Sequence, residues 1–328
     1  MPLTAPLSES TIVITGASGG IGAATARALA ARGASVVLAA RGVEALGRVA
    51  ADCRAAGGRA LVVPTDVTDP AAVTDLATRA AAATGRIDGW VNNATEAVYG
   101  LLTDVPPEEF RRVVEVNLLG TAYGMRAALP HLRAAGGGVL VNNASVLAEI
   151  TMPYMSSYNA AKHGVRGLSD TVRQELRHEP WARRISVCTV LPATIDTPFF
   201  ANAANHSGRR PAPPPPVYPP EVVARAIIRM LERPRRETYA GAAAALLGFQ
   251  WRLLPGITER VLGAYGARTV LSDRPAPDTT GNLTGSRATG RARGEWHGMG
   301  RMLARTGAAT GLAVGAAAIL TARRRRAS

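Results

Sequence analysis

Short runs of β-branched residues alternate with Ala/Leu-rich stretches of helical period through the first 240 residues of this 328-residue chain. Strands are expected at residues 11–15, 35–39, 60–63, 87–92, 138–142, 185–191 and 238–241. Helices are expected at residues 21–32, 43–56, 71–84, 108–134, 154–178 and 220–232. This alternation predicts a parallel β-sheet with helices on both faces.

Strands and helices in this order restrict the topology further. Right-handed crossovers predict a Rossmann-type doubly wound α/β fold, in which a ligand lies beyond the carboxyl ends of the strands. With 47% hydrophobic residues the chain is long enough for a full core, which excludes a disordered or collagen-like protein. We expect a single domain over residues 1–241 and a C-terminal extension.

A glycine-rich turn follows the first expected strand and opens the first expected helix, which is the context of a phosphate-binding loop. Its residues are Thr15, Gly16, Ala17, Ser18, Gly19, Gly20, Ile21 and Gly22. Glycines let backbone N–H groups approach a pyrophosphate, and the helix N-terminus adds partial positive charge. We interpret the turn as a dinucleotide site; a tight turn without a ligand is the alternative.

The second expected strand is followed by Arg41, where a cofactor with a free ribose 2′-hydroxyl favours an acidic residue. A guanidinium can bind a 2′-phosphate with two hydrogen bonds, so the sequence predicts NADP(H) in preference to NAD(H). A solvated arginine at a strand end is the alternative.

Tyr158 and Lys162 stand four positions apart within an expected helix, so their side chains share one face. Lys162 is the only lysine among 38 basic residues. A nearby ammonium stabilises phenolate, and we therefore expect it to bring the pKa of Tyr158 closer to neutrality and allow general acid/base catalysis.

Together these motifs resemble the short-chain dehydrogenase/reductase family over about residues 10–241. The match includes the turn, Asp66 and Val67 after the third strand, and the Asn92-Asn93-Ala94 motif, where Thr95 replaces the family's glycine. The family's catalytic serine and asparagine match Ser145, thirteen residues before Tyr158, and Asn117, 41 residues before it.

The resemblance implies a role for each matched residue. Ser145 is expected to hydrogen-bond a substrate carbonyl, Tyr158 to exchange a proton with its oxygen, Lys162 to hold the nicotinamide ribose, and Asn117 to anchor a water relay. After the sixth strand, Pro192, Ile195 and Thr197 match the loop that contacts the nicotinamide, whereas Ala193 replaces a glycine. The cofactor-binding residues implied in this way also include Asn93 and Ala94. The family further implies a homodimer or homotetramer.

Several segments leave alternatives open. Residues 199–221 correspond to the family's variable segment over the substrate; a lid, a disordered loop and a polyproline II ligand are all compatible with their proline run. Residues 242–267 begin with an apolar stretch that suits a substrate pocket or a membrane interface. Residues 268–300 lack periodicity and predict a mostly disordered linker.

The last segment, residues 301–328, is expected to hold a short Gly/Ala-rich helix with an Arg-rich end. Residues 306–322 carry no charge and precede four arginines, so a membrane span, a surface-lying helix or hairpin and a soluble helix are compatible with it. No secretory signal or disulfide pattern is visible, and we expect a cytoplasmic protein with membrane association as an open alternative. No cluster suggests a metal site.

The net charge of +14 is concentrated in the C-terminal third: residues 1–199 contribute +1, residues 200–267 +5 and residues 268–328 +8. This segregation, without aromatic residues between the arginines, argues against nucleic-acid binding. The leading hypothesis is an NADP-dependent oxidoreductase of a small, hydrophobic carbonyl or alcohol. The alternative is a non-catalytic NADP-binding protein on the same fold.

Overall fold

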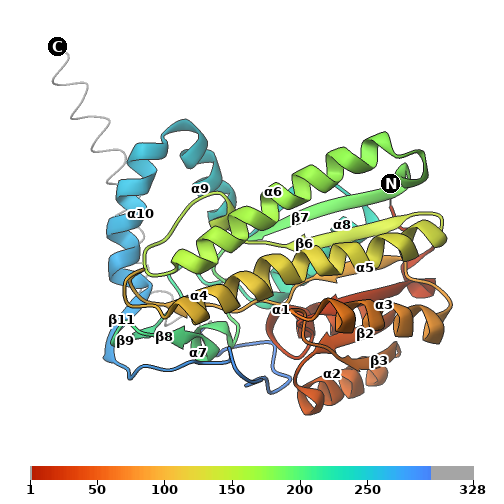
Figure 1. Cartoon of the computed structure of the whole chain (residues 1–328), viewed down its shortest axis with the longest axis horizontal. Helices are drawn as coiled ribbons and strands as arrows, with labels where there is room; N and C mark the ends of the chain where they lie inside the picture. Colours follow the sequence, from red (N-terminus) through yellow and green to blue (C-terminus); the bar gives the residue numbers. More distant parts are fainter. Residues whose placement is uncertain (1, 297–328) are drawn as a thin grey trace.

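The computed structural model describes residues 2–296, and a seven-stranded parallel sheet forms its centre (Figure 1). The strand order is β10-β7-β6-β4-β1-β2-β3. These strands are β1 (Thr11–Thr15), β2 (Ser35–Ala40), β3 (Arg59–Pro64), β4 (Gly89–Asn92), β6 (Gly138–Asn143), β7 (Ile185–Pro192) and β10 (Glu237–Ala240). All seven pair in parallel, which confirms the predicted doubly wound α/β fold.

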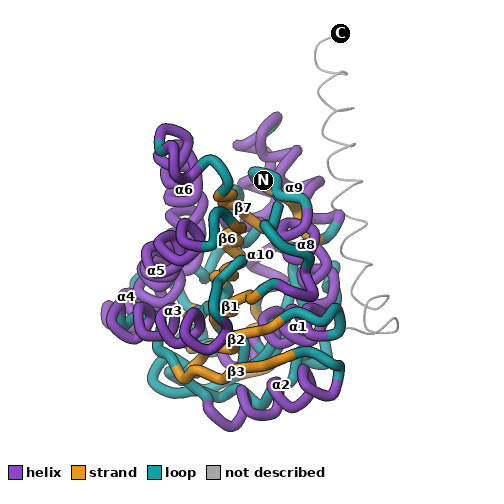
Figure 2. The backbone as a smooth tube through the Cα atoms, turned by 90° about the vertical axis from the view of Figure 1, so that its right-hand side faces the viewer, coloured by secondary structure: helices purple, strands orange, loops and turns teal. Residues whose placement is uncertain are grey.

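Helices cover both faces of this sheet (Figure 2). One face carries α1 (Gly20–Ala30), α2 (Val43–Ala55) and α8 (Pro220–Glu232). The other carries α3 (Pro70–Thr84), α4 (Pro107–Val114), α5 (Gly120–Ala134) and α6 (Ser156–His178). Apolar side chains of the strands are buried on each face, and each helical layer closes its own core cluster. Burial on both faces explains the nearly continuous apolar character of the strands.

The expected helix over residues 108–134 is interrupted. Between α4 and α5 the chain forms one π-helical segment, Glu115–Leu119, which contains Asn117. Such bulges occur often at functional sites, because they redirect side chains within an otherwise continuous helix. Hydrophobic periodicity does not reveal an insertion of this kind.

A second group of elements lies beyond the carboxyl ends of β6 and β7. These elements are β5 (Val98–Tyr99), α7 (Phe199–Asn202), β8 (Ala204–Asn205), β9 (Arg209–Pro211), α9 (Ala242–Leu253), α10 (Pro255–Thr269) and β11 (Leu271–Pro275). β5 pairs with β8 and β9 with β11 in two small sheets, and α9 contacts α10. The segment from Phe199 to Glu221, predicted as the variable segment over the substrate, contains α7, β8 and β9.

The segment predicted as a mostly disordered linker, residues 268–300, contains β11 in the part that the structure describes, which ends at residue 296. β11 pairs with β9, and the following chain makes backbone hydrogen bonds to distant loops. These long-range bonds supply an order that local periodicity does not show. The predicted tail helix over residues 306–322 lies outside the described residues, and no described helix has the length and apolarity to cross a bilayer.

A buried network of polar side chains links β4, β6 and α6, and α5 packs against it. The Asn92 side chain accepts a hydrogen bond from Trp90 Nε1 at 2.8 Å and donates one to Asn142 Oδ1 at 2.9 Å. Asn142 Nδ2 donates to Ser169 Oγ on α6 at 2.8 Å. Gly124 on α5 packs against this network, since a Cβ there would lie 2.0 Å from Asn92 Oδ1.

We therefore expect Gly124→Ala to lower the free energy of unfolding by about 2–3 kcal/mol, because it displaces a buried hydrogen-bonded side chain. Gly47→Ala on α2 is the matched control, with no atom within 4 Å of the added Cβ. The control should stabilise the protein by about 0.5–1 kcal/mol through helix propensity. Urea unfolding measures both, and equal effects would contradict the packing argument.

Candidate active site

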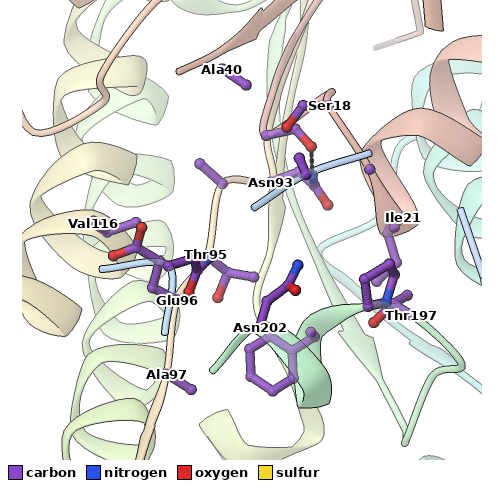
Figure 3. Close-up of a pocket in the computed structure, with 18 of the residues that line it drawn as sticks. Ser18, Ile21, Ala40, Asn93, Thr95, Glu96, Ala97, Val116, Thr197 and Asn202 are labelled. Atoms are coloured by element: carbon purple, nitrogen blue, oxygen red, sulfur yellow. Dashed lines mark hydrogen bonds between the residues drawn. The ribbon is translucent and has the colours of Figure 1, made fainter. Parts of the chain in front are cut away.

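One cavity lies at the carboxyl ends of the strands and is lined by most of the residues expected from the sequence. Figure 3 shows part of its lining and labels Ser18, Ile21, Asn93 and Thr197 among them. Of the predicted cofactor and catalytic residues, those that line it are Gly16, Ser18, Gly20, Ile21, Arg41, Asp66, Val67, Asn93, Ala94, Ser145, Tyr158, Lys162, Pro192, Ile195 and Thr197. Thr15, Gly22 and Asn117 do not line it.

Thr15 and Gly22 belong to the glycine-rich turn of residues 15–22, which we call the phosphate turn, and they fix its backbone without lining the cavity. Thr15 Oγ1 accepts hydrogen bonds from the backbone N–H groups of Asn93 at 3.0 Å and Ala94 at 3.2 Å. A Cβ at Gly22 would lie 2.3 Å from the Gly16 carbonyl oxygen, and Gly16 itself has φ +65°. Glycine is required at both positions, because the chain turns tightly with no room for side chains.

Ser145, Tyr158 and Lys162 come together at the other end of the cavity. Ser145 follows β6, while Tyr158 and Lys162 lie near the start of α6. Lys162 is buried, donates from Nζ to the Asn143 carbonyl oxygen at 3.1 Å, and lies 5.4 Å from the Tyr158 ring centroid. The strand end and the helix start thus bring a hydroxyl, a phenol and an amine to one wall.

Burial shifts the pKa values of Tyr158 and Lys162 in opposite directions. It raises the pKa of Tyr158 to about 12, although the nearby hydroxyls of Ser145 and Thr95 lower it. Burial also lowers the pKa of Lys162 to about 7. For Tyr158, desolvation therefore outweighs the two neighbouring hydroxyls, and the direction of the shift is upward.

Asn117 does not line the cavity but holds the backbone of Glu96, which does. Its side-chain Nδ2 donates to the Glu96 carbonyl oxygen and its Oδ1 accepts from the Glu96 N–H, both at 2.9 Å. Asn117 is fully buried on the π-helical segment. The side chain thus fixes the loop that follows β4, and these contacts do not support the predicted water relay.

Near β2 the cavity contains two further charged residues, Glu96 and Arg112, that the sequence analysis did not identify. The buried Glu96 carboxylate accepts a hydrogen bond from Arg41 Nη2 at 2.6 Å, and its second oxygen lies 3.6 Å from Arg112 Nε. Arg112 also donates to Asp66 Oδ2 at 2.8 Å. Burial raises the pKa of Glu96 to about 7, even though both arginines lower it.

The opposite wall of the cavity belongs to the loop after β7. Ile195 and Thr197 line it, together with Phe199 and Phe200 of α7. The departure at Ala193 is accommodated, since its N–H donates to the Ala240 carbonyl oxygen at 2.9 Å. The residues of α9 do not line this cavity, so a contact of the 242–254 segment with substrate gains no support.

Residues after β11 also line the cavity and were missed by sequence reasoning. They are Asn282, Ser286, Arg287, Ala288, Thr289 and Arg291. The only sequence signal in this region is its Gly, Arg and Thr content, which resembles that of a linker. Among residues 2–296, no group of three or more His, Cys, Asp or Glu side chains is placed to hold a metal ion.

The cavity fits a nicotinamide dinucleotide. Its glycine-rich turn presents backbone without side chains, with the Gly20 N–H bonded to the Arg291 carbonyl oxygen at 3.0 Å. Its β2 end offers charged groups, and its far end holds a buried amine beside a phenol. These are the surroundings that phosphates, an adenosine ribose and a nicotinamide ribose require. Arg41, Lys162 and the turn would hold it.

Comparisons with known proteins agree with this geometry. The family model described as short chain dehydrogenase matches residues 10–208. An uncharacterized oxidoreductase of Bacillus subtilis, YxnA, is 36% identical over 272 residues, which cover 82% of this chain and 76% of the relative. The cis-4-hydroxycyclohexanecarboxylate dehydrogenase of Sinomonas cyclohexanicum is 43% identical over 196 residues, covering 59% and 76%.

Solved structures show the same arrangement. An alcohol dehydrogenase from Thermococcus sibiricus complexed with 5-hydroxy-NADP has a TM-score of 0.61 and 28% identity, covering 70% of this chain and 95% of its own. A short-chain dehydrogenase/reductase from Burkholderia phymatum in complex with NAD has a TM-score of 0.66 and 27% identity, covering 76% and 96%. This chain belongs to the short-chain dehydrogenase/reductase family and is an NAD(P)-dependent oxidoreductase.

Proposed function

We propose that the protein transfers a hydride between NADP(H) and a carbonyl or secondary alcohol. The observation that carries this proposal is the convergence of Ser145, Tyr158 and Lys162 on the cavity that the phosphate turn also lines. The alternative of a non-catalytic NADP-binding protein required that Ser145 and Tyr158 lie apart, and both line this one cavity.

When bound, the reduced cofactor supplies the hydride. Ser145 donates a hydrogen bond to the carbonyl oxygen of the substrate, and Tyr158 delivers the proton to that oxygen. Lys162 holds the nicotinamide ribose hydroxyls and stabilises the phenolate that remains, because it lies beside the ring. Asn117 keeps the loop of Thr95 and Glu96 in place through its two hydrogen bonds.

The raised pKa of Tyr158 favours carbonyl reduction near neutral pH. A phenol with a pKa of about 12 is protonated there and ready to act as a general acid. Oxidation of an alcohol needs the phenolate, which becomes accessible only as the pH rises.

Preference for NADP(H) is supported by the charge at the end of β2. Arg41 lines the cavity directly after β2, where an acidic side chain would repel a 2′-phosphate, and Arg287 lines the same cavity. The related solved structures hold either NADP-type or NAD cofactors, so the preference rests on the residues of this chain.

A hydrophobic substrate is supported by the aromatic wall beside Tyr158. The Phe199 ring packs edge-on against Tyr158, with 5.6 Å between centroids, and Phe200 packs on Phe199 at 5.3 Å. The relative from Sinomonas is named for a substrate with a hydroxyl and a carboxylate on a cyclohexane ring. We therefore infer that a ring-containing secondary alcohol or its ketone fits with its apolar ring beside Phe199.

Tyr158→Phe tests the mechanism, because it removes only the proton donor. We expect turnover to fall by about 10²- to 10⁴-fold while the dissociation constant for NADPH stays near that of the unaltered protein. The control is Tyr123→Phe on α5, outside the cavity, which should leave turnover unchanged. Steady-state kinetics and a cofactor titration measure both, and retained turnover in Tyr158→Phe would refute the assigned role.

The pH dependence of carbonyl reduction tests Lys162. Its pKa of about 7 means that the ammonium loses its proton as pH rises through neutrality, so the reduction rate should fall between pH 6 and pH 9. The rate of the reverse oxidation should rise with pH as Tyr158 ionises. In Lys162→Arg the cation persists, so the residual reduction rate should not change over this range. A flat profile for the unaltered protein would argue against a titrating Lys162.

A further inference from the structure

The segment of residues 278–296, which we call the strap, follows β11 and runs below α7 in the view of Figure 1. Several of its residues line the cavity. Near α7 it is fixed by backbone hydrogen bonds: Asn205 N–H to the Thr279 carbonyl oxygen at 2.8 Å, and Asn282 N–H to that of Asn202 at 2.9 Å. Gly281 approaches the chain so closely that a Cβ there would lie 2.4 Å from Ala204 N. The first residues of the strap are therefore held against α7 and β8.

Its other end is fixed to the phosphate turn itself. Gly290 N–H donates to the Ser18 carbonyl oxygen at 3.1 Å, and Gly20 N–H donates to that of Arg291 at 3.0 Å. Arg27 Nη2 donates to the Gly290 carbonyl oxygen at 2.7 Å, and Asp196 accepts from Gly294 N–H at 3.0 Å. The strap therefore forms part of the wall of the cavity that extends from Arg41 to Tyr158.

The donors of Arg41 are already engaged by neighbouring acceptors. Nη2 bonds to Glu96 Oε1 and to the Asn282 carbonyl oxygen, both at 2.6 Å, and Nη1 bonds to the Leu283 carbonyl oxygen at 3.1 Å. The Glu96 carboxylate also compensates the charge of Arg41. Arg41 thus holds the strap as much as it faces the cavity, which leaves it few donors for a phosphate.

Arg287 is an uncompensated cation on the same side of the cavity. It lines the cavity, its side chain is exposed, and within residues 2–296 the structure places no hydrogen bond or ion pair on it. Its neighbour Ser286 lies against the residue that follows Arg41, since a Cβ at Gly42 would be 2.5 Å from Ser286 Oγ. The strap thus brings a hydroxyl and a guanidinium to the β2 end of the cavity, where an adenosine ribose would lie.

We propose that the strap completes the dinucleotide site and that Arg287, assisted by Ser286, binds the 2′-phosphate of NADP. This inference rests on the proposed cofactor preference and assigns that preference to residues outside the region matched by the family model, which ends at residue 208. Arg41 then acts mainly as a positioning residue that anchors the strap. A guanidinium binds a phosphate through charge-assisted hydrogen bonds that one cationic side chain can dominate.

Calorimetric titration of the full chain with NADP⁺ and NAD⁺ tests this assignment. We expect Arg287→Ala to weaken NADP⁺ binding by about 10- to 100-fold and NAD⁺ binding by less than about twofold, because only NADP⁺ carries the 2′-phosphate. Arg287→Lys should restore part of the loss, because its ammonium keeps the charge without the planar fork. The matched control is Arg274→Ala on β11, also exposed but outside the cavity, which should change neither affinity.

Deuterium exchange gives an independent readout of the strap. We expect NADP⁺ to slow the exchange of backbone amides in residues 282–291, because the strap would cover the bound dinucleotide. Faster exchange would show that the cofactor displaces the strap and would overturn the proposal. So would an Arg287→Ala variant that binds NADP⁺ as tightly as the unaltered protein, or one that loses NADP⁺ and NAD⁺ equally.

The same titrations separate this inference from the proposed function. Equal affinity of the unaltered protein for NADP⁺ and NAD⁺ would refute the preference proposed above and this assignment with it. A clear preference for NADP⁺ that Arg287→Ala leaves intact would overturn only the role of the strap.

Discussion

The close approach of the phosphate turn to the loop after β4 is the contact on which the rest of the site depends. A Cβ at Gly16 would lie 2.7 Å from the Ala94 Cα, so the two backbones touch. The Asn93 side chain donates to the Thr15 carbonyl oxygen and accepts from Asn143, whose own carbonyl oxygen accepts from Lys162. One chain of hydrogen bonds therefore links the glycine-rich turn to Lys162 across the ends of β1, β4 and β6. A cofactor held by the turn is positioned relative to Lys162 by rigid strands.

Burial has opposite effects on the two ionisable groups at the far end of this chain. It keeps Tyr158 neutral and lowers the proton affinity of Lys162, because either charge is poorly solvated there. The site thus holds a protonated phenol beside an amine that titrates near neutrality. Such a pair suits the proton delivery to a carbonyl oxygen that the proposed function requires.

Local pattern was sufficient to predict the central sheet, the phosphate turn and the pairing of Tyr158 with Lys162. Strand alternation, glycine spacing and the four-residue helical repeat are all short-range signals, and they placed these groups at one edge of the sheet. The ion pair of Arg41 with Glu96 was beyond reach, because it joins the end of β2 to the loop after β4. The strap was beyond reach for a different reason: its order comes from backbone hydrogen bonds to distant loops, so its composition resembles that of a linker.

The structure of the complex with NADP⁺, determined by crystallography, tests the central claim most directly. The account predicts the nicotinamide ring beside Tyr158 and Ser145, the ribose hydroxyls on Lys162, and the adenosine ribose between the end of β2 and the strap. A dinucleotide bound outside this cavity, or bound with its adenosine beside Tyr158, would contradict the account.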